Sequence, residues 1–327
     1  MRTSRRRIGL ALAGSVALSI CSFAQAQGFP ERPVRLIVPY AAGGGTDVLV
    51  RQVAKHAAPF LGQQIIIDNK PGAGTTIAAA EVARAQPDGY TVMWGDNATF
   101  ALNPHLYPKL SYDPLALSLV TLTVKGSLVL SASSGLGVRT VPELISYAKA
   151  HPGKLSYGSP GNASPHHLAM EAFKLRAGKL SIQHVPYKGE APALQDLMAG
   201  NLDLMFSGSR IAKAQADTGK IALLATSGPA RNPVLPDVPT IAEAGLPGFS
   251  YQYWHGLVAP PKTPAEVIAK LNAAFTKALS QPELLAWIAS TSGAETAPST
   301  PAQMHTFMRE EIAKSAEIVK AIGLKVD

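Results

Sequence analysis

Short apolar runs alternate with longer amphipathic stretches along almost the whole chain. The runs are rich in Val, Ile and Leu, as buried strands are, whereas the longer stretches repeat apolar residues at the spacing of one helix face. We expect strands at residues 34–38, 65–67, 90–94, 128–130, 155–157, 182–185, 202–206, 221–225 and 254–258. We expect helices at residues 47–60, 75–85, 142–150, 165–177, 191–199, 264–280 and 301–322. The alternation predicts an α/β fold.

Start signals support two of these helices. Thr140 precedes a Val-Pro-Glu sequence, and Thr263 precedes Pro-Ala-Glu. In both places a residue that can cap a helix stands before a proline that fits the first turn, where a missing N–H removes no helical hydrogen bond. Each threonine therefore predicts the beginning of a helix.

Two segments are typical of passages between domains. Residues 118–125 are extended, rich in Leu and Thr and without a helical period, while residues 229–248 are crowded with prolines and glycines. Two crossings predict one lobe formed by both ends of the chain and another formed by its middle. We expect residues 27–124 plus 231–327 in lobe I and residues 125–230 in lobe II. A cleft between two lobes is a common place for a small-ligand site.

The first 26 residues have the layout of a secretory signal peptide. A start with four arginines precedes an apolar run at residues 8–20 and an Ala-Gln-Ala cleavage site that ends at Ala26. The apolar run is too short to span a membrane stably. Residues 4–8 also resemble a twin-arginine signal, so the export route stays open. We expect cleavage after Ala26 and a periplasmic protein. We expect no lipid anchor at Cys21, because the preceding Ile20 is bulky where a lipid-attachment site needs a small residue.

Removal of the signal peptide changes the charge and the cysteine content. The 327-residue chain has a formal charge of +8, but the 301 residues after Ala26 carry 26 basic and 22 acidic residues, or +4, and no cysteine. Disulfides and a thiol nucleophile are therefore excluded from the mature chain. No cluster of Lys and Arg interleaved with aromatics remains, so nucleic acid is not an expected partner. No later apolar run is long enough to span a membrane, so we expect a soluble protein. We also expect it to be a monomer.

A glycine-rich turn follows the first expected strand. Its residues are Tyr40, Ala41, Ala42, Gly43, Gly44, Gly45, Thr46 and Asp47. Consecutive glycines let the backbone approach a bound group closely, and Thr46 or Asp47 can cap the next helix. The first amides of a helix lack internal partners and lie at the positive end of its dipole. The turn is therefore a candidate anion site, although an unliganded strand–helix connection has the same features.

Two further segments are candidates for the opposite wall of the cleft. Both follow expected strands, at the sheet edge where α/β proteins bind ligands. They are Ser159, Pro160, Gly161, Asn162, Ala163 and Ser164 in one segment and Ser207, Gly208 and Ser209 in the other. In the first segment Asn162 or Ser164 can cap a helix, so a ligand carboxylate can sit on its amides; the plain alternative is a capped helix.

Other chemistry has weaker support. His166, His167 and Glu171 suggest a metal site, but neighbouring helix residues point about 100° apart and no further ligand completes the set. Neither the glycine turn nor the second glycine run at Gly72-Ala73-Gly74 carries the Lys-Ser/Thr of a phosphate-binding loop, and the chain has no Gly-x-Ser-x-Gly elbow. Ser207 lacks an evident base. We expect no catalytic residue, no metal and no cofactor.

Short motifs that run in order along the chain resemble the solute receptors of tripartite tricarboxylate transporters, often called the Bug family. Besides the glycine turn, the motifs are DNKPGAG (68–74), PDGYT (87–91), NPHLY (103–107), GNASPHHLA (161–169), VPYKG (185–189), AGNLD (199–203) and PTIAEAGLPGF (239–249). The resemblance implies a two-lobed periplasmic binding protein, type II-like in fold. Such a protein closes on a small carboxylate and delivers it to integral-membrane permease subunits.

The resemblance also implies site residues. In that family one ligand carboxylate is held by the first glycine turn and by the facing loop of the other lobe. Carried over, residues 40–47 form the first site, and residues 159–164 with His167, together with residues 207–209, oppose it. Asn97 and Thr99 are expected to line the wall.

The ligand itself is not carried over from the family. Ala41 and Ala42 replace a proline-bearing stretch, which can widen the site, and residues 115–120 lack the usual aromatic, which can alter closure. Two polar turns favour a dicarboxylate, aliphatic or aromatic. Two other functions stay open on the same fold: a subunit that presents its ligand to a membrane signalling protein, and an exported enzyme.

Overall fold

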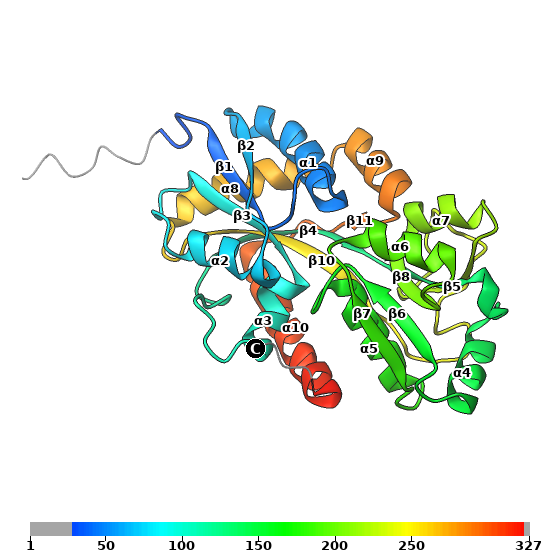
Figure 1. Cartoon of the computed structure of the whole chain (residues 1–327). Coiled ribbons are helices and arrows are strands. Elements are labelled where there is room, and N and C mark those ends of the chain that lie inside the picture. The colour runs from blue at the N-terminus through cyan, green and yellow to red at the C-terminus, as the bar shows by residue number, and fades with distance from the viewer. Residues whose placement is uncertain (1–27, 324–327) are drawn as a thin grey trace, which may run out of the picture.

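The computed structural model describes residues 28–323, and the expected signal peptide with its cleavage site lies outside the described residues. The described chain forms two α/β lobes joined side by side, one containing both ends of the described chain and the other its middle (Figure 1). Each lobe has its own mixed sheet with helices packed against it. The expected α/β class and two-lobed architecture are therefore confirmed.

Lobe I contains a six-stranded sheet in the order β11-β4-β10-β3-β1-β2. β1 is parallel to β2 and β3, whereas β10 runs antiparallel to β3 and β4. The strands are β1 (Val34–Val38), β2 (Ile65–Asn69), β3 (Thr91–Asp96), β4 (Ser118–Gly126), β10 (Tyr253–Ala259) and β11 (Glu295–Thr296). The helices are α1 (Gly45–Leu61), α2 (Thr76–Ala83), α3 (Asn103–Leu106), α8 (Ala265–Leu279), α9 (Pro282–Ser292) and α10 (Pro301–Ile322), with short helical turns at Ala73–Thr75 and Ala98–Leu102.

Lobe II contains a five-stranded sheet in the order β7-β6-β8-β5-β9. β6 is parallel to β7 and β8, and β5 runs antiparallel to β8 and β9. The strands are β5 (Leu128–Ser133), β6 (Leu155–Ser159), β7 (Ile182–Pro186), β8 (Leu204–Gly208) and β9 (Ile221–Thr226). The helices are α4 (Val141–Ala150), α5 (Pro165–Arg176), α6 (Glu190–Ala199) and α7 (Ser209–Ala216), with a short turn at Ser134–Leu136.

Strand β1 shows why its sequence is apolar at consecutive positions. Val34, Leu36 and Val38 belong to the core cluster that contains residues of α1 and α8, while Ile37 belongs to a different cluster, which contains residues of α2 and α10. A parallel strand covered on both faces loses the alternation of polar and apolar residues that marks a half-exposed strand. Its carboxyl end, and with it the glycine turn, is thereby fixed to the core.

The two lobes are joined at a pair of neighbouring crossings. The first runs from β4 through Ser127 into β5, and the second enters β10 after Tyr251. Ser227 links them, because its Oγ accepts from Leu128 N at 2.9 Å and donates to the Tyr251 carbonyl at 2.7 Å. Both crossings are thus held to one hydroxyl.

Several residues that follow β9 pack on elements of lobe II. Thr240 forms a bridge with Thr226 of β9, and Ile241, Phe249 and Tyr251 are buried in the lobe II core. The Phe249 ring meets Phe173 of α5 edge-on at 6.4 Å. We propose that lobe II extends to Tyr251 and that the return to lobe I lies at residues 252–253, after the proline-rich segment rather than before it.

The helix starts agree with the sequence in part. Thr140 caps α4 in a reciprocal capping box with Glu143, as expected. Thr263 does not cap α8: Pro264 is the N-cap, and the Thr263 hydroxyl donates to the Pro260 carbonyl at 2.8 Å. Helix α1 begins at Gly45 with Gly44 as its N-cap and no capping side chain, so the expectation that Thr46 or Asp47 caps it was wrong.

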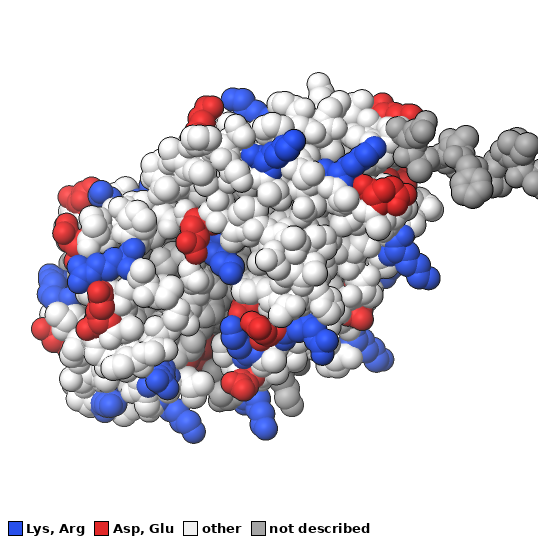
Figure 2. All heavy atoms as spheres, turned by 180° about the vertical axis from the view of Figure 1, so that it is seen from behind, with Lys and Arg blue, Asp and Glu red and all other residues white. Residues whose placement is uncertain are grey.

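No helix within residues 28–323 has the length and apolar character needed to cross a membrane. On the face shown in Figure 2, basic and acidic side chains are interspersed over both lobes, and that face carries no continuous band of one sign.

Candidate functional site

The glycine turn leaves β1 and leads into α1 with an open approach to the helix amides. Gly43 has φ +82°, a left-handed conformation that disfavours residues with a Cβ. A Cβ added at Gly45 would meet no atom within 4 Å. Residues 41–45 are exposed. Because Gly44 offers no side chain to cap α1, the first amides of this helix are available to an external acceptor.

Asp47 holds this turn from behind. Its side chain is buried and accepts hydrogen bonds from Gly43 N, Arg51 Nε and Asn69 Nδ2, each at 2.9 Å. The same Asn69 amide donates to the Tyr40 carbonyl at 2.9 Å. Burial alone would raise the pKa of Asp47, but these donors outweigh it and hold the pKa at about 2. Asp47 is therefore a buried brace of the turn.

The opposing turn follows β6 in lobe II. Ser159 is fully buried; its Oγ donates to the Gly161 carbonyl at 2.9 Å and accepts from Gly161 N at 3.2 Å. Ala163 adopts φ +61°, and Ser164 caps α5 by accepting from His167 N at 3.3 Å. The expected cap at Ser164 is confirmed. The turn is thus held in a defined shape by its own side chains.

His167 lies buried behind this turn. Its Nδ1 accepts from Ala163 N at 3.0 Å, and its ring stacks on His184 with centroids 3.9 Å apart. His184 Nε2 in turn lies 2.7 Å from Ser159 Oγ. Burial, together with the charge of Lys174, lowers the pKa of His167 to about 3 and that of His184 to about 4. The two neutral rings therefore support the turn from inside.

Glu171 forms hydrogen bonds with side chains other than the two neighbouring histidines. It accepts from Tyr157 OH at 2.5 Å and from Lys174 Nζ at 2.6 Å, whereas His167 Nε2 lies 4.0 Å away. Within the described residues, no group of three His, Cys, Asp or Glu side chains is placed to hold a metal ion.

The three residues of the expected segment 207–209 have different hydrogen-bond partners. Ser207 is fully buried and its Oγ has no hydrogen-bond partner among the described residues. Gly208 N donates to Glu190 Oε1 at 2.7 Å. Ser209 Oγ accepts from Asn232 Nδ2 at 2.8 Å. Ser209 thus connects α7 to the segment after β9, while the buried Ser207 hydroxyl is unpaired among the described residues.

Asn97 and Thr99, expected at the cleft wall, are bonded to neighbouring backbone and side chains. Asn97 Oδ1 accepts from Trp254 N at 2.7 Å, which fixes the start of β10. Thr99 is fully buried, and its Oγ1 lies 2.9 Å from Thr75 Oγ1 and 3.1 Å from Asp96 Oδ1. Both side chains position neighbouring groups, Asn97 the backbone of Trp254 and Thr99 the side chain of Asp96. Their contact with a ligand stays a prediction.

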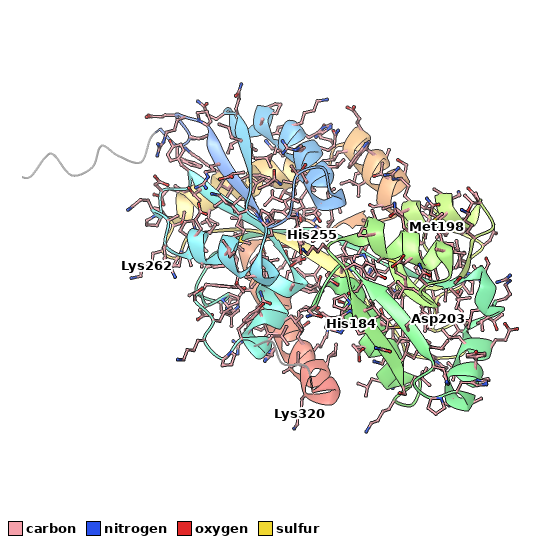
Figure 3. The ribbon with its side chains drawn as sticks, in the orientation of Figure 1. His184, Met198, Asp203, His255, Lys262 and Lys320 are labelled. Atoms are coloured by element: carbon pink, nitrogen blue, oxygen red, sulfur yellow. The ribbon has the colours of Figure 1, made fainter. Side chains whose placement is uncertain are left out.

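Five residues form what we call the interlobe centre: Asp96, His166, Glu190, Tyr251 and His255. Asp96 ends β3 and accepts a hydrogen bond from Tyr40 OH of the glycine turn. His255 lies directly opposite Asp96 on β10, and antiparallel partners share a sheet face. From lobe II, His166 Nε2 lies 3.8 Å from Glu190 Oε1. Figure 3 labels His255 where the two lobes meet.

The interlobe centre has unused hydrogen-bonding capacity. His166 Nδ1, Tyr251 OH and His255 Nδ1 are buried without a partner among the described residues, as is the Oγ of Ser207, the residue before Gly208. Buried polar groups in folded proteins are nearly always paired, so a concentration of unpaired ones marks a place for a ligand or ordered water. The sequence offered little sign of this centre, because its residues come from four separate segments, and only Tyr251 and His255 lie near each other along the chain.

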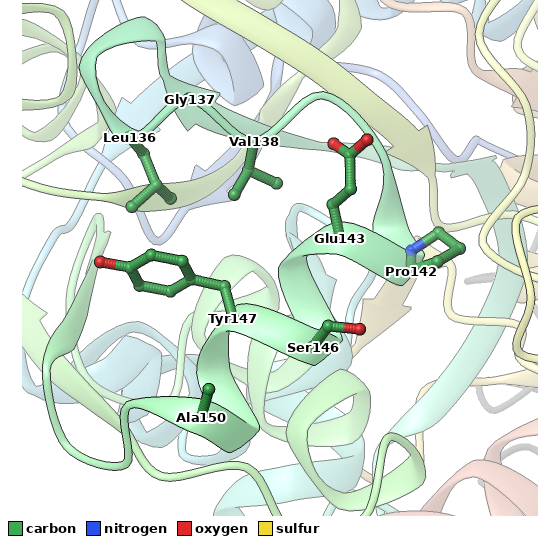
Figure 4. A pocket seen from close by; sticks show the side chains of 8 residues that line it. All are labelled: Leu136, Gly137, Val138, Pro142, Glu143, Ser146, Tyr147 and Ala150. Atoms are coloured by element: carbon green, nitrogen blue, oxygen red, sulfur yellow. The ribbon is translucent and has the colours of Figure 1, made fainter.

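A separate hollow lies on the outer side of lobe II, beside α4. It has a volume of about 580 Å³ and is lined by residues that include Leu136, Val138 and Tyr147 (Figure 4). None of its lining residues belongs to the glycine turn, the opposing turn or the interlobe centre.

Residues 49–324 match the family described as the tripartite tricarboxylate transporter family receptor. A curated relative from Cupriavidus necator, a UPF0065 protein in the gbd 5' region, is 36 % identical, and the match covers 97 % of this chain and 96 % of the relative. Protein BugT of Bordetella pertussis is 33 % identical over 301 residues, with coverages of 91 % and 91 %.

Three solved structures share the fold over most of the chain. Rpa4515 of R. palustris with adipate has a TM-score of 0.83 and 35 % identity and covers 91 % of this chain and 100 % of its own. The periplasmic binding protein BugD has a TM-score of 0.81 and 33 % identity, with coverages of 91 % and 100 %. MatC (Rpa3494) of Rhodopseudomonas palustris with bound malate has a TM-score of 0.79 and 35 % identity, with coverages of 89 % and 100 %. This chain therefore belongs to the tripartite tricarboxylate transporter receptor family of periplasmic binding proteins.

Proposed function

We propose that this protein captures a small organic carboxylate in the periplasm by closing its two lobes and delivers it to integral-membrane subunits of a tripartite tricarboxylate-type transporter. The observation that carries the proposal is the open glycine turn at the start of α1. It presents helix amides without a capping side chain, on a backbone that Asp47 holds in place. An anion at such a helix start is favoured by both the amides and the dipole.

The position of the opposing turn supports capture between the lobes. Both turns follow the carboxyl ends of parallel strands, β1 in lobe I and β6 in lobe II. Ligands of open α/β sheets bind at this edge. We propose that residues 40–47 hold the carboxylate first and that residues 159–164 and 207–209 meet it on closure. The preference for a dicarboxylate stays a prediction.

The solved neighbours support the ligand class. Rpa4515 was determined with adipate and MatC with malate, and both of these ligands are carboxylates. Delivery to membrane subunits rests on membership of the receptor family. We infer from the same membership that binding, without turnover, is the task of this chain, and that it acts as a monomer exported to the periplasm.

A thermal-shift screen of the mature protein tests the proposal. Carboxylates, neutral sugars and organic cations are each added at saturating concentration. A specific carboxylate at about 100 times its dissociation constant adds roughly 2.7 kcal/mol of stability. We expect a shift with at least one carboxylate. Shifts with sugars or cations alone would overturn the proposal, and turnover of a bound carboxylate would replace it with an enzymatic function.

A further inference from the structure

The interlobe centre receives an acidic side chain from each lobe. Asp96 comes from lobe I and Glu190 from lobe II, where it begins α6. Every charged group that shifts the pKa values of His166, Tyr251 and His255 is a carboxylate, either Asp96, Glu190 or Glu311. Within the described residues, no Lys or Arg forms an ion pair with Asp96 or Glu190. The negative charge of this centre is therefore uncompensated by protein cations.

Glu190 is the group best placed to meet a ligand. Its Oε1 accepts from Gly208 N at 2.7 Å, but its Oε2 accepts no hydrogen bond from the described residues. The side chain is 23 % exposed, and His166 beside it is 18 % exposed. Asp96, in contrast, is 2 % exposed and is already bonded to Tyr40 and Thr99. Asp96 thus contributes its negative charge from a buried position, while Glu190 Oε2 is a free hydrogen-bond acceptor.

The histidines do not supply the missing positive charge. Burial lowers the pKa of His255 to about 4 and also lowers the pKa of His166, against the opposing pull of the carboxylates. Both rings are therefore neutral at pH 7. Tyr251 is buried and its hydroxyl has no partner among the described residues, so it adds one more polar group that a ligand can satisfy.

We propose that the ligand carries an ammonium group at the end remote from its carboxylate, and that Glu190 binds this group at the interlobe centre. The inference rests on the proposed function, because it places the carboxylate on the glycine turn. A cation beside Glu190 and Asp96 gains from both charges in a site largely shielded from water. A second ligand carboxylate there would face like charges without a counterion, which disfavours binding. The substrate class is then an amino carboxylic acid rather than a simple dicarboxylate.

Calorimetric titration of the mature protein with matched ligand sets tests this. Each set has one chain length and three remote ends: a methyl, an ammonium and a carboxylate, for example hexanoate, 6-aminohexanoate and adipate. The four- and five-carbon sets are run in the same way. We expect the ammonium member of the best-binding set to bind at least about tenfold more tightly than its dicarboxylate partner.

Glu190→Gln then separates charge from shape. Glutamine keeps an oxygen that can accept from Gly208 N, so the fold and the shape of the site are preserved, while the charge is removed. The preference for the ammonium member should fall by about tenfold. Glu310→Gln, at an exposed position on α10, is the matched control and should leave the preference unchanged. Equal melting temperatures of the two variants exclude misfolding as the cause.

The possible outcomes separate the two proposals. If the dicarboxylate binds as tightly as the ammonium member, or if Glu190→Gln leaves their ratio unchanged, the ammonium proposal is wrong while the carboxylate receptor stands. If no member of any set binds, the ammonium proposal falls, and the wider thermal-shift screen decides whether the protein binds a carboxylate at all.

Discussion

At the scale of single residues, the buried polar groups behind the two turns decide their shape. Asp47 fastens the glycine turn through Gly43 N, and His167 fastens the opposing turn through Ala163 N. The sequence indicated both residues as ligand contacts or caps. It could not show that their side chains point into the protein, because Asn69 and His184, which complete the arrangements, lie far away along the chain.

Replacing Asp47 with alanine should destabilise the protein and weaken carboxylate binding together. The change removes the carboxylate that accepts from Gly43 N, Arg51 Nε and Asn69 Nδ2, and hydrogen bonds to a charged group contribute about 1.5–3 kcal/mol. Chemical denaturation gives the change in unfolding free energy. Asp237→Ala, at an exposed position, is the control and should stay within about 0.5 kcal/mol of the wild type.

The stacked histidines should make the protein sensitive to mild acid. In the folded protein the pKa is about 3 for His167 and about 4 for His184, against about 6.5 in the unfolded chain. Below pH 6.5 the unfolded chain therefore binds protons that the folded protein does not. Stability is complete above that pH and falls as the pH drops toward 4, by about 1.4 kcal/mol per pH unit for each histidine.

Denaturation measured at several pH values checks this slope. The slope is proportional to the number of protons that the unfolded chain binds in excess of the folded protein. His184→Gln should lower that number by about one below pH 6. The same slope in wild type and variant would contradict a neutral, half-buried His184. Asp47 acts in a lower window: its pKa of about 2 is below the ordinary value of 3.8, so its stabilisation is present above that value and is lost as the pH falls toward 2.

At the scale of elements, most strands and most amphipathic helices could be predicted, whereas β4, α7 and α9 could not. β1, β6 and α4 lie where the apolar pattern placed them. β4 looked like a mere passage because its Leu- and Thr-rich sequence is buried on both faces and shows no alternation. Helices α7 and α9 were missed, since neither Ser209–Ala216 nor Pro282–Ser292 carries a long apolar repeat.

A similar limit of sequence patterns applies to the proposed return to lobe I at residues 252–253. Residues 229–248 were interpreted as a linker from their prolines and glycines. Ile241 and Phe249 nevertheless reach the lobe II core, since a few large apolar residues suffice to anchor an irregular segment. Composition could not reveal this, because it does not say which cluster an isolated apolar residue joins.

Ser227→Ala should loosen the connection between the lobes. The variant leaves Leu128 N and the Tyr251 carbonyl without their shared partner, both in buried surroundings. We expect a loss of about 1–3 kcal/mol of stability and faster amide exchange of Leu128. Ser290→Ala, whose hydroxyl donates only to an exposed helical carbonyl, is the control. Unchanged exchange at Leu128 in Ser227→Ala would show that the hydroxyl does not hold the crossings.

At the scale of the whole molecule, two lobes joined by two neighbouring crossings are suited to closure about that junction. Hinge closure needs only a few residues to change conformation, and Ser127 and residues 252–253 are the candidates. The sequence could predict two lobes from its two passage segments and from the family motifs. It could not predict the interlobe centre, whose five residues come together only when both lobes are in place.

Small-angle X-ray scattering tests closure directly. Addition of a carboxylate that the thermal-shift screen identifies should reduce the radius of gyration of the mature protein, because the lobes approach each other around the ligand. A ligand that shifts the melting temperature is expected to produce this change at the same concentration. An unchanged radius at saturation would mean that the ligand binds without lobe closure.

The central claim is that the glycine turn binds the ligand carboxylate, and titration of Gly45→Val tests it most directly. A Cβ at Gly45 meets no atom within 4 Å, so valine fits the unliganded fold, but its side chain occupies the approach to the first amides of α1. Gly135→Val serves as the control, because the nearest atom to a Cβ added there is Ser133 Oγ at 3.9 Å. The account predicts that Gly45→Val weakens binding of the best carboxylate by at least about a hundredfold, equivalent to roughly 2.8 kcal/mol, while Gly135→Val binds like the wild type. Equal dissociation constants for all three proteins would contradict it.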